Sequence, residues 1–157
     1  MGSMQKSGQQ PGPSAGRLSS SSSGPTTTKG RGDRAEALAR AHLQQSGLRW
    51  LDSNFRTPGR GGGEIDLIMR EPDGTLVFVE VRQRSAKGHG GAGASIGAIK
   101  QRRIVYAARH YLARLTSVPP CRFDVVLIDG AIDGVVDRSI NQGGARLTWL
   151  KGAFEAF

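Results

Sequence analysis

Two acidic residues, Asp66 and Glu80, lie within neighbouring hydrophobic segments of the sequence. The segments EIDLIMR and TLVFVEVRQR flank the turn sequence Glu-Pro-Asp-Gly, which predicts an antiparallel hairpin. Because side chains alternate along a strand, Asp66 and Glu80 can meet across this hairpin. Two carboxylates so close repel each other unless a cation lies between them, and Mg²⁺ accepts one or two carboxylates together with water and phosphate oxygens. The spacing therefore indicates a site for Mg²⁺ or Mn²⁺.

A second interpretation of the same strands needs no metal. Strict alternation puts Asp66 and Ile68 on one face of their strand and Ile65, Leu67 and Met69 on the other. The face with the acids can be exposed to solvent, with its carboxylates paired to arginines of the two strands. Those arginines are Arg70, Arg82 and Arg84.

A long basic stretch follows the acidic pair, because no Asp or Glu occurs from Val81 to Phe123. Lysine and arginine neutralise phosphates, and an acidic metal site beside such a surface is what metal-assisted phosphodiester cleavage requires. A basic helix face that is merely solvated is the alternative. The basic residues of the stretch are Arg82, Arg84, Lys87, Lys100, Arg102, Arg103, Arg109, Arg114 and Arg122.

The composition limits the kind of protein. A chain of 157 residues that is 37% hydrophobic suits one domain with a modest core. No apolar run approaches the roughly 18 residues that span a membrane. No apolar signal segment is visible and Cys121 is the single cysteine, so we expect a cytoplasmic protein without an internal disulfide. The net charge of +9 favours nucleic acid as the partner over an acidic membrane surface.

The N-terminal half predicts a tail and the first elements of one domain. Residues 1–30 are rich in Ser, Gly and Pro and are expected to be disordered, so the domain covers 31–157. A helix is predicted from an N-cap at Asp33 to Gly47, and a strand follows at 48–55. The loop TPGRGGG is so rich in glycine that it is either mobile or close to another segment.

The C-terminal half predicts a helix and a further strand. The helix, at 96–115, has one apolar face, and it connects the hairpin to a strand at 122–130 that should lie parallel in the same sheet. Asp124 of this strand is expected to be structural or to support a basic residue. Residues 131–157 have no clear assignment. The apolar face of the helix consists of Ile104, Val105, Ala108, Tyr111, Leu112 and Leu115.

A family resemblance adds to this interpretation. The sequence contains, in order, the motifs G-D-R-A-E-x-L-A, N-F-R, G-E-I-D-L-I, F-V-E-V-R, A-x-x-Y-L and R-F-D-V-V. Over residues 31–130 it resembles the bacterial YraN family, also called UPF0102. That family is similar to the PD-(D/E)XK nucleases, whose relatives include restriction endonucleases and archaeal Holliday junction resolvases. The resemblance implies an α/β fold with an αβββαβ core, in which helices flank a mixed central sheet.

The resemblance also implies roles for individual residues. Glu36, Asp66 and Glu80 would form the metal site, helped by the Val81 carbonyl, although Glu36 has a surface ion pair with Arg40 as its alternative. Arg82 stands where these nucleases have a lysine. A guanidinium does not lose its proton, so Arg82 can only anchor phosphate or stabilise the transition state. Either catalysis is slower for this reason, or Lys100 supplies the missing amine. The expected nucleic-acid contacts are Arg84, Lys87, Gln101, Arg102, Arg103 and Arg109.

The expected function is that of a Mg²⁺-dependent endonuclease acting on DNA, with branched or double-stranded DNA as its partner. The alternative is a binding module that keeps the nuclease fold with little activity, for which Arg82 is the main argument. Paired cuts would require a homodimer. Its candidate interface is Trp149, Leu150 and Phe154, and packing of these residues on their own sheet is the other interpretation.

Overall fold

The hairpin around Glu-Pro-Asp-Gly forms the middle of the fold. In the computed structural model, which describes residues 28–84, 96–130, 132 and 145–156, strand β2 (Glu64–Arg70) pairs antiparallel with β3 (Leu76–Arg84). Two hydrogen bonds close the turn, from the Glu71 N–H to the Thr75 carbonyl (2.9 Å) and from the Gly74 N–H to the Glu71 carbonyl (3.0 Å). Gly74 has a φ of 94°, which glycine adopts without strain. The predicted hairpin is confirmed.

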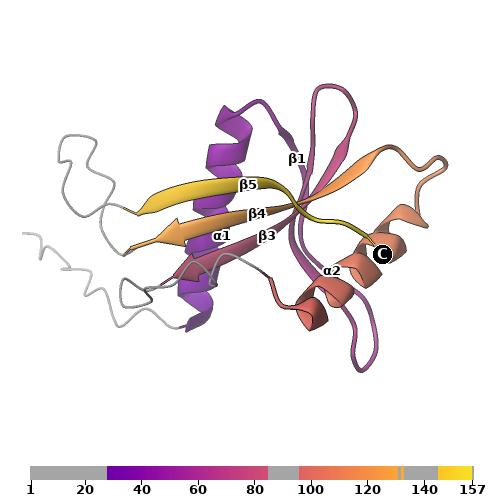
Figure 1. The fold of residues 1–157 in the computed structure, drawn as a ribbon, viewed down its shortest axis with the longest axis horizontal. Coiled ribbons are helices and arrows are strands. Elements are labelled where there is room, and N and C mark those ends of the chain that lie inside the picture. Colours follow the sequence, from indigo (N-terminus) through magenta and orange to yellow (C-terminus); the bar gives the residue numbers. More distant parts are fainter. Residues whose placement is uncertain (1–27, 85–95, 131, 133–144, 157) are drawn as a thin grey trace, which may run out of the picture.

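The remaining elements complete a sheet in the order β1-β2-β3-β4-β5 (Figure 1). They are α1 (Thr28–Gln45), β1 (Arg49–Arg56), α2 (Ala98–Leu112), β4 (Cys121–Asp129) and β5 (Arg146–Phe154). Strands β3 and β4 are parallel, as predicted, and the other neighbours are antiparallel. The α/β fold class with its αβββαβ core is confirmed, and β5 extends the sheet by one strand.

Helix α1 ends as predicted but begins earlier. Its C-terminus is a Schellman motif, in which the Leu48 N–H donates to the Leu43 carbonyl (3.1 Å) and Gly47 has a φ of 96°. The predicted start at Asp33 is wrong, because the helix begins at Thr28. The glycines between Thr28 and Asp33 weaken a helix without blocking its hydrogen bonds, as a proline would. Residues 1–27 of the predicted tail lie outside the described residues.

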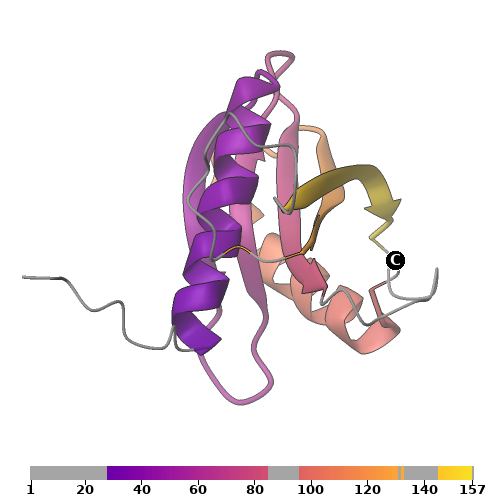
Figure 2. The ribbon, with the colours of Figure 1, turned by 90° about the vertical axis from the view of Figure 1, so that its left-hand side faces the viewer.

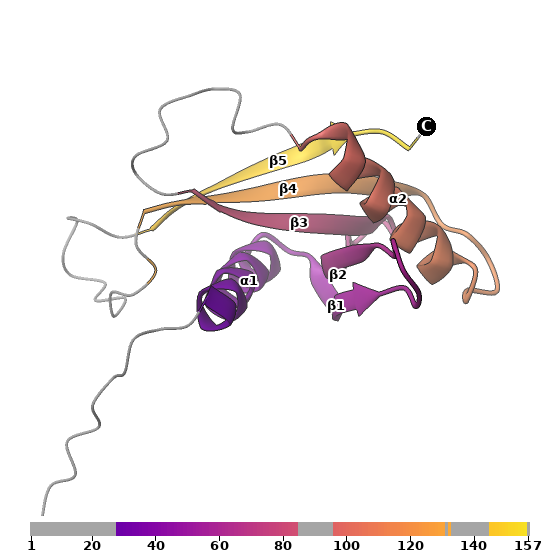
Figure 3. The ribbon, with the colours of Figure 1, turned by 90° about the horizontal axis from the view of Figure 1, so that it is seen from below.

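The two helices cover opposite faces of the sheet (Figures 2 and 3). On the α2 side, Ile104 and Ala108 pack against Phe78 and Ile68, and the predicted apolar face of the helix is confirmed. On the α1 side, Leu43 packs with Val79 and its neighbours on the sheet. Neither helix of the described residues is long and apolar enough to cross a membrane.

The buried carboxylate of Asp124 joins β5 to the sheet. It accepts hydrogen bonds from Arg122 Nε (2.7 Å), Trp149 Nε1 (2.9 Å) and the Gly152 N–H (2.9 Å). Asp124 is therefore structural and also holds a basic residue, as predicted. Leu150 and Phe154 pack on the α2-side core and Trp149 on the α1-side core. The C-terminal apolar residues thus pack on their own sheet, which was the second interpretation of them.

The glycine-rich loop before β2 lies close to α2. A Cβ atom on the buried Gly63 would be 1.9 Å from the Arg103 carbonyl oxygen, far inside van der Waals contact. The loop was expected to be either mobile or close to another segment, and at Gly63 it is close to α2. The contact brings the start of β2 against the middle of α2.

Replacement of Gly63 by alanine should therefore destabilise the fold by about 2–3 kcal/mol, because the added methyl group meets a backbone carbonyl that cannot rotate away. Gly97→Ala is the matched control, since Gly97 has an ordinary φ of −61° and a methyl group there would have no neighbour within 4 Å. Urea unfolding, monitored by circular dichroism, measures the stability of both variants. Equal unfolding midpoints for the two variants would contradict the close contact.

Candidate metal and nucleic-acid site

The site begins where β2 and β3 separate. Their pairing runs from Arg70↔Leu76 to Leu67↔Val79, after which β3 continues beside β4. Beyond this point the Val81 N–H donates to Asp66 Oδ2 (2.8 Å). A carboxylate thus takes the place of the next strand carbonyl, and this bond fixes the Asp66 side chain between the two strands.

The strict alternation predicted for β2 is wrong at Ile65. Ile65 and Ile68 both belong to the α2-side core, whereas Leu67 belongs to the α1-side core. The interruption lies beside Asn54 of β1, which has a φ of 54° and lies between the pairs Ser53↔Leu67 and Phe55↔Ile65. A left-handed residue changes the direction of β1 at this level. The paired strand β2 follows this change, so side chains no longer alternate strictly between its two faces here.

Asp66 and Glu80 nevertheless converge, as predicted. The two carboxyl groups are close enough for each to act on the pKa of the other. The Glu80 side chain is 9% exposed, and Lys100 Nζ lies 3.1 Å from its Oε2. The structure therefore brings Asp66, Glu80 and Lys100 into one cluster.

The electrostatics of the pair follow from burial and from like charge. Burial, and then the neighbouring Asp66, raises the pKa of Glu80 to about 7, while Lys100 opposes the rise. Burial also raises the pKa of Asp66, against the lowering effect of the Val81 N–H and of Lys100. The pair is therefore unfavourable as two charges at neutral pH, and a cation beside it would relieve this.

The donor set fits a hard divalent cation. Glu80 Oε2 is buried, and the Lys100 ammonium is its neighbour at 3.1 Å. In the part of the chain that the structure describes, no three His, Cys, Asp or Glu side chains are grouped to hold a metal. Two carboxylates with water and substrate oxygens are nonetheless a common set for Mg²⁺.

Glu36 lies apart from this pair, on the α1 side. Asn54 Nδ2 donates to Glu36 Oε2 (2.8 Å), and the two residues line a pocket of about 220 Å³ together with Arg40. Burial raises the pKa of Glu36, with smaller contributions from Asp66, Asp33 and Glu64. The Arg40 guanidinium stacks on Trp50, 4.7 Å from the ring centre. The charge of Asp66 therefore acts on Glu36, whose hydrogen-bond partner is Asn54 in place of the expected Arg40.

The predicted nucleic-acid contacts and Arg82 differ in their surroundings. Arg84 is held by Asp129 through two hydrogen bonds of 2.7 Å, and Gln101 Nε2 donates to the Ile96 carbonyl (2.8 Å), so both side chains have structural partners. Arg82 is half-buried on β3, and Lys87 lies outside the described residues. The exposed group on α2 consists of Arg102, Arg103 and Arg109.

Sequence reasoning missed the surroundings of the glycine-rich loop. Arg56 donates to Glu64 Oε1 (2.7 and 2.9 Å), and both line a pocket of about 410 Å³ with Arg103. It also missed Asn54, the partner of Glu36. The signal for Asn54 and Arg56 was the N-F-R motif, which carries both residues.

Fold and site together define a mixed α/β protein in which a buried Glu80 and a half-buried Asp66 converge beside a basic helix. The chain belongs to the uncharacterised protein family UPF0102, whose model matches residues 35–128, and the resemblance seen in the sequence is confirmed. It is 66% identical over 130 residues to a UPF0102 protein of Polaromonas naphthalenivorans, which covers 83% of this chain and 82% of the relative. It is 49% identical over 133 residues to a UPF0102 protein of Methylibium petroleiphilum, with 83% and 98% covered.

The raised pKa of Glu80 predicts how the stability of the metal-free protein depends on pH. The folded state holds the Glu80 proton up to about pH 7, whereas the unfolded chain releases it near 4.5. The stabilisation is therefore complete below pH 4.5 and is lost as the pH rises through about 7, a change of about 3 kcal/mol. Urea unfolding in EDTA, repeated between pH 4.5 and 8, measures this change in the free energy of unfolding.

Glu80→Gln should remove most of this pH dependence, because an amide does not titrate. Glu155→Gln is the control, since Glu155 is an exposed acid near the end of the chain. A Glu80→Gln protein whose stability still falls by the wild-type amount over this range would contradict the assignment.

Proposed function

We propose that this protein is a Mg²⁺-dependent endonuclease that hydrolyses DNA phosphodiester bonds. The observation that supports the proposal most strongly is the convergence of Asp66 and Glu80 where β2 and β3 separate, with Lys100 beside them. Burial raises the pKa of both carboxyls and the charge of Asp66 raises that of Glu80 further, although Lys100 lies beside them and opposes the rise. Such a pair is suited to a cation.

The side chains have distinct tasks in this reaction. Asp66 and Glu80 hold the cation, with the Val81 carbonyl as a further oxygen, and the Val81 N–H keeps Asp66 in position. When bound, Mg²⁺ would acidify a water molecule and stabilise charge on the phosphate. Arg102 and Arg103, exposed on α2, hold the DNA backbone at neighbouring phosphates. Glu36, on the other side of β2, adds negative charge near Asp66.

Lys100 supplies the amine that Arg82 cannot. Its Nζ lies 3.1 Å from Glu80, within reach of a water molecule hydrogen-bonded to the same carboxylate. A lysine can lose a proton and assist the attacking water, whereas a guanidinium stays charged. The lysine of this site thus comes from α2 in place of β3.

DNA cleavage by one such domain is confined to one strand at a time, because the described residues contain one pair of this kind. Paired cuts in branched or double-stranded DNA would therefore involve two copies of the chain. The competing function is a DNA-binding module with little activity. The half-buried Arg82 in the lysine position is the observation that favours it.

Cleavage of labelled duplex, flap, single-stranded and four-way junction DNA with Mg²⁺ or Mn²⁺ tests the proposal. Asp66→Asn should lower the rate by about 100-fold or more, because it removes a charge from the cation site while the amide oxygen can still accept from Val81. Glu155→Gln is the control and should cut normally. Binding without metal-dependent cleavage of any of these substrates would favour the binding module.

The role of Lys100 is tested by exchanging the two basic residues. Lys100→Arg keeps the charge beside Glu80 but cannot lose a proton, so we expect it to slow cleavage by about 10- to 100-fold. Adding Arg82→Lys should restore part of the rate, since β3 then supplies the amine. Full activity of Lys100→Arg alone would contradict the role of Lys100, and the pH–rate profile of each variant reports the group that titrates.

A further inference from the structure

A pocket on α2 lies on the flank of the helix away from the carboxylate pair. Its volume is about 430 Å³, within the usual range for small-molecule sites. The described residues that line it are Ala98, Arg102, Val105, Tyr106 and Arg109, which recur at helical spacing and form one stripe. Lys100, Arg103 and Ala107 form the other stripe, which faces Glu80 and Gly63. The pocket is therefore separate from the proposed cation site.

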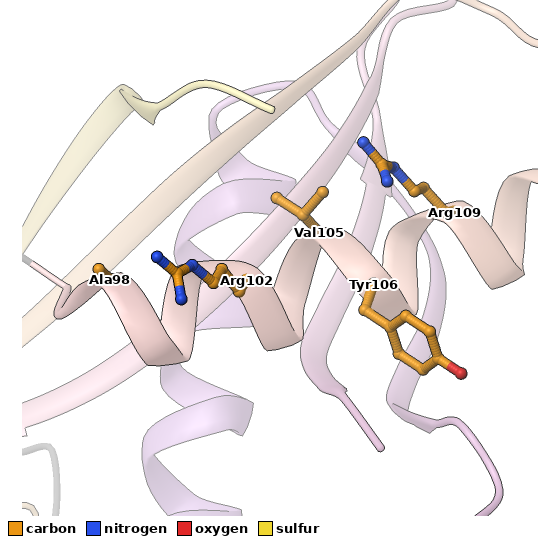
Figure 4. Close-up of a pocket in the computed structure, with 5 residues that line it drawn as sticks. All are labelled: Ala98, Arg102, Val105, Tyr106 and Arg109. Atoms are coloured by element: carbon orange, nitrogen blue, oxygen red, sulfur yellow. The ribbon is translucent and has the colours of Figure 1, made fainter. Parts of the chain in front are cut away.

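The lining combines three chemical groups. Figure 4 shows Arg102 and Arg109 on either side of Val105, and the Tyr106 ring extending from the helix between them in the other direction. Val105 gives the pocket an apolar wall, and Tyr106 is 47% exposed, an unusual amount for a large aromatic side chain. The His110 ring packs against Tyr106 edge-on, 4.5 Å between centres, which supports the ring from one side. An exposed aromatic ring with an arginine one helical turn before it and another one turn after it suits a nucleotide, whose base can stack on the ring while its neighbouring phosphates pair with the arginines.

We propose that this pocket binds an unpaired base of a single-stranded DNA segment, stacked on Tyr106 with its flanking phosphates on Arg102 and Arg109. A base within a duplex is stacked and paired on both sides, so an aromatic ring can reach only an unpaired one. The inference rests on the proposed function, because it takes DNA as the occupant, and it narrows the substrate to DNA with an unpaired segment. Such a segment would cross α2 while the scissile strand lies at Asp66 and Glu80.

Fluorescence of 2-aminopurine tests this pocket in EDTA, where a metal-dependent nuclease cannot cut. A single-stranded oligonucleotide carrying one 2-aminopurine should lose fluorescence when it binds the full-length protein, because stacking quenches the base. Tyr106→Ala should abolish the quenching and weaken binding about tenfold, within the range that removal of a stacking ring produces. Tyr106→Leu keeps the apolar bulk and should show the same loss, whereas Tyr106→Phe should bind within about twofold of wild type.

Ile99→Ala is the matched control, since Ile99 is 71% exposed on the same helix and does not line the pocket. Arg102→Ala should reduce the salt dependence of binding by about one unit, as expected for one lost phosphate contact. An abasic oligonucleotide should bind about tenfold more weakly than the intact one, with no effect of Tyr106→Ala. Equal affinity of the wild type for intact and abasic strands would overturn the proposal. Displacement of the oligonucleotide by polyglutamate in a manner that depends on Tyr106 would also overturn it, because the occupant would then be an acidic protein segment.

The same variants separate this inference from the proposed nuclease function. Tyr106-dependent quenching in a protein that cleaves no DNA would support the pocket while the nuclease proposal fails. Metal-dependent cleavage that Tyr106→Ala leaves unchanged on every substrate, together with unchanged quenching, would overturn the pocket alone. Asp66→Asn should quench 2-aminopurine as well as wild type, because Asp66 lies towards the other flank of α2.

Discussion

The hydrogen bond from the Val81 N–H to Asp66 is the interaction on which the candidate site depends. Where β3 leaves β2, an amide on β3 would otherwise lose its partner, and an unpaired buried N–H is costly. The Asp66 carboxylate satisfies it and is thereby held next to Glu80. The geometry of the acidic pair thus follows from the need to end a strand ladder without leaving a polar group unsatisfied.

The position of α2 decides how the charge of this pair is balanced. The helix brings Lys100 to Glu80, and its place along the sheet is set by the close approach of Gly63 to the Arg103 carbonyl. A bulkier residue at position 63 would move the helix outward and with it the ammonium group. Loop, helix and acidic pair are therefore mechanically connected, although Gly63 itself carries no reactive group.

The sequence predicts the parts of this protein that depend on local patterns. The hairpin, the apolar face of α2 and the convergence of Asp66 with Glu80 follow from periodicity and turn chemistry, and the parallel β4 follows from the long connection before it. Other features depend on contacts between distant segments and have no local signal. Three features are of this kind, since each is decided by tertiary packing. They are the left-handed conformation of Asn54 beside the interruption at Ile65, the hydrogen bond between Asn54 and Glu36, and the formation of β5.

The parallel arrangement of β3 and β4 has a consequence for the order in which the site assembles. Asp66 and Glu80 lie on one local hairpin and can meet while the rest of the chain is still open, because closing a short loop costs little entropy. Lys100 arrives only when α2 docks during the slower, non-local closure of β4 onto β3. We therefore expect the two carboxylates to face each other early without their lysine, so that the pH and the dissolved cations of the buffer influence folding before Lys100 is in place.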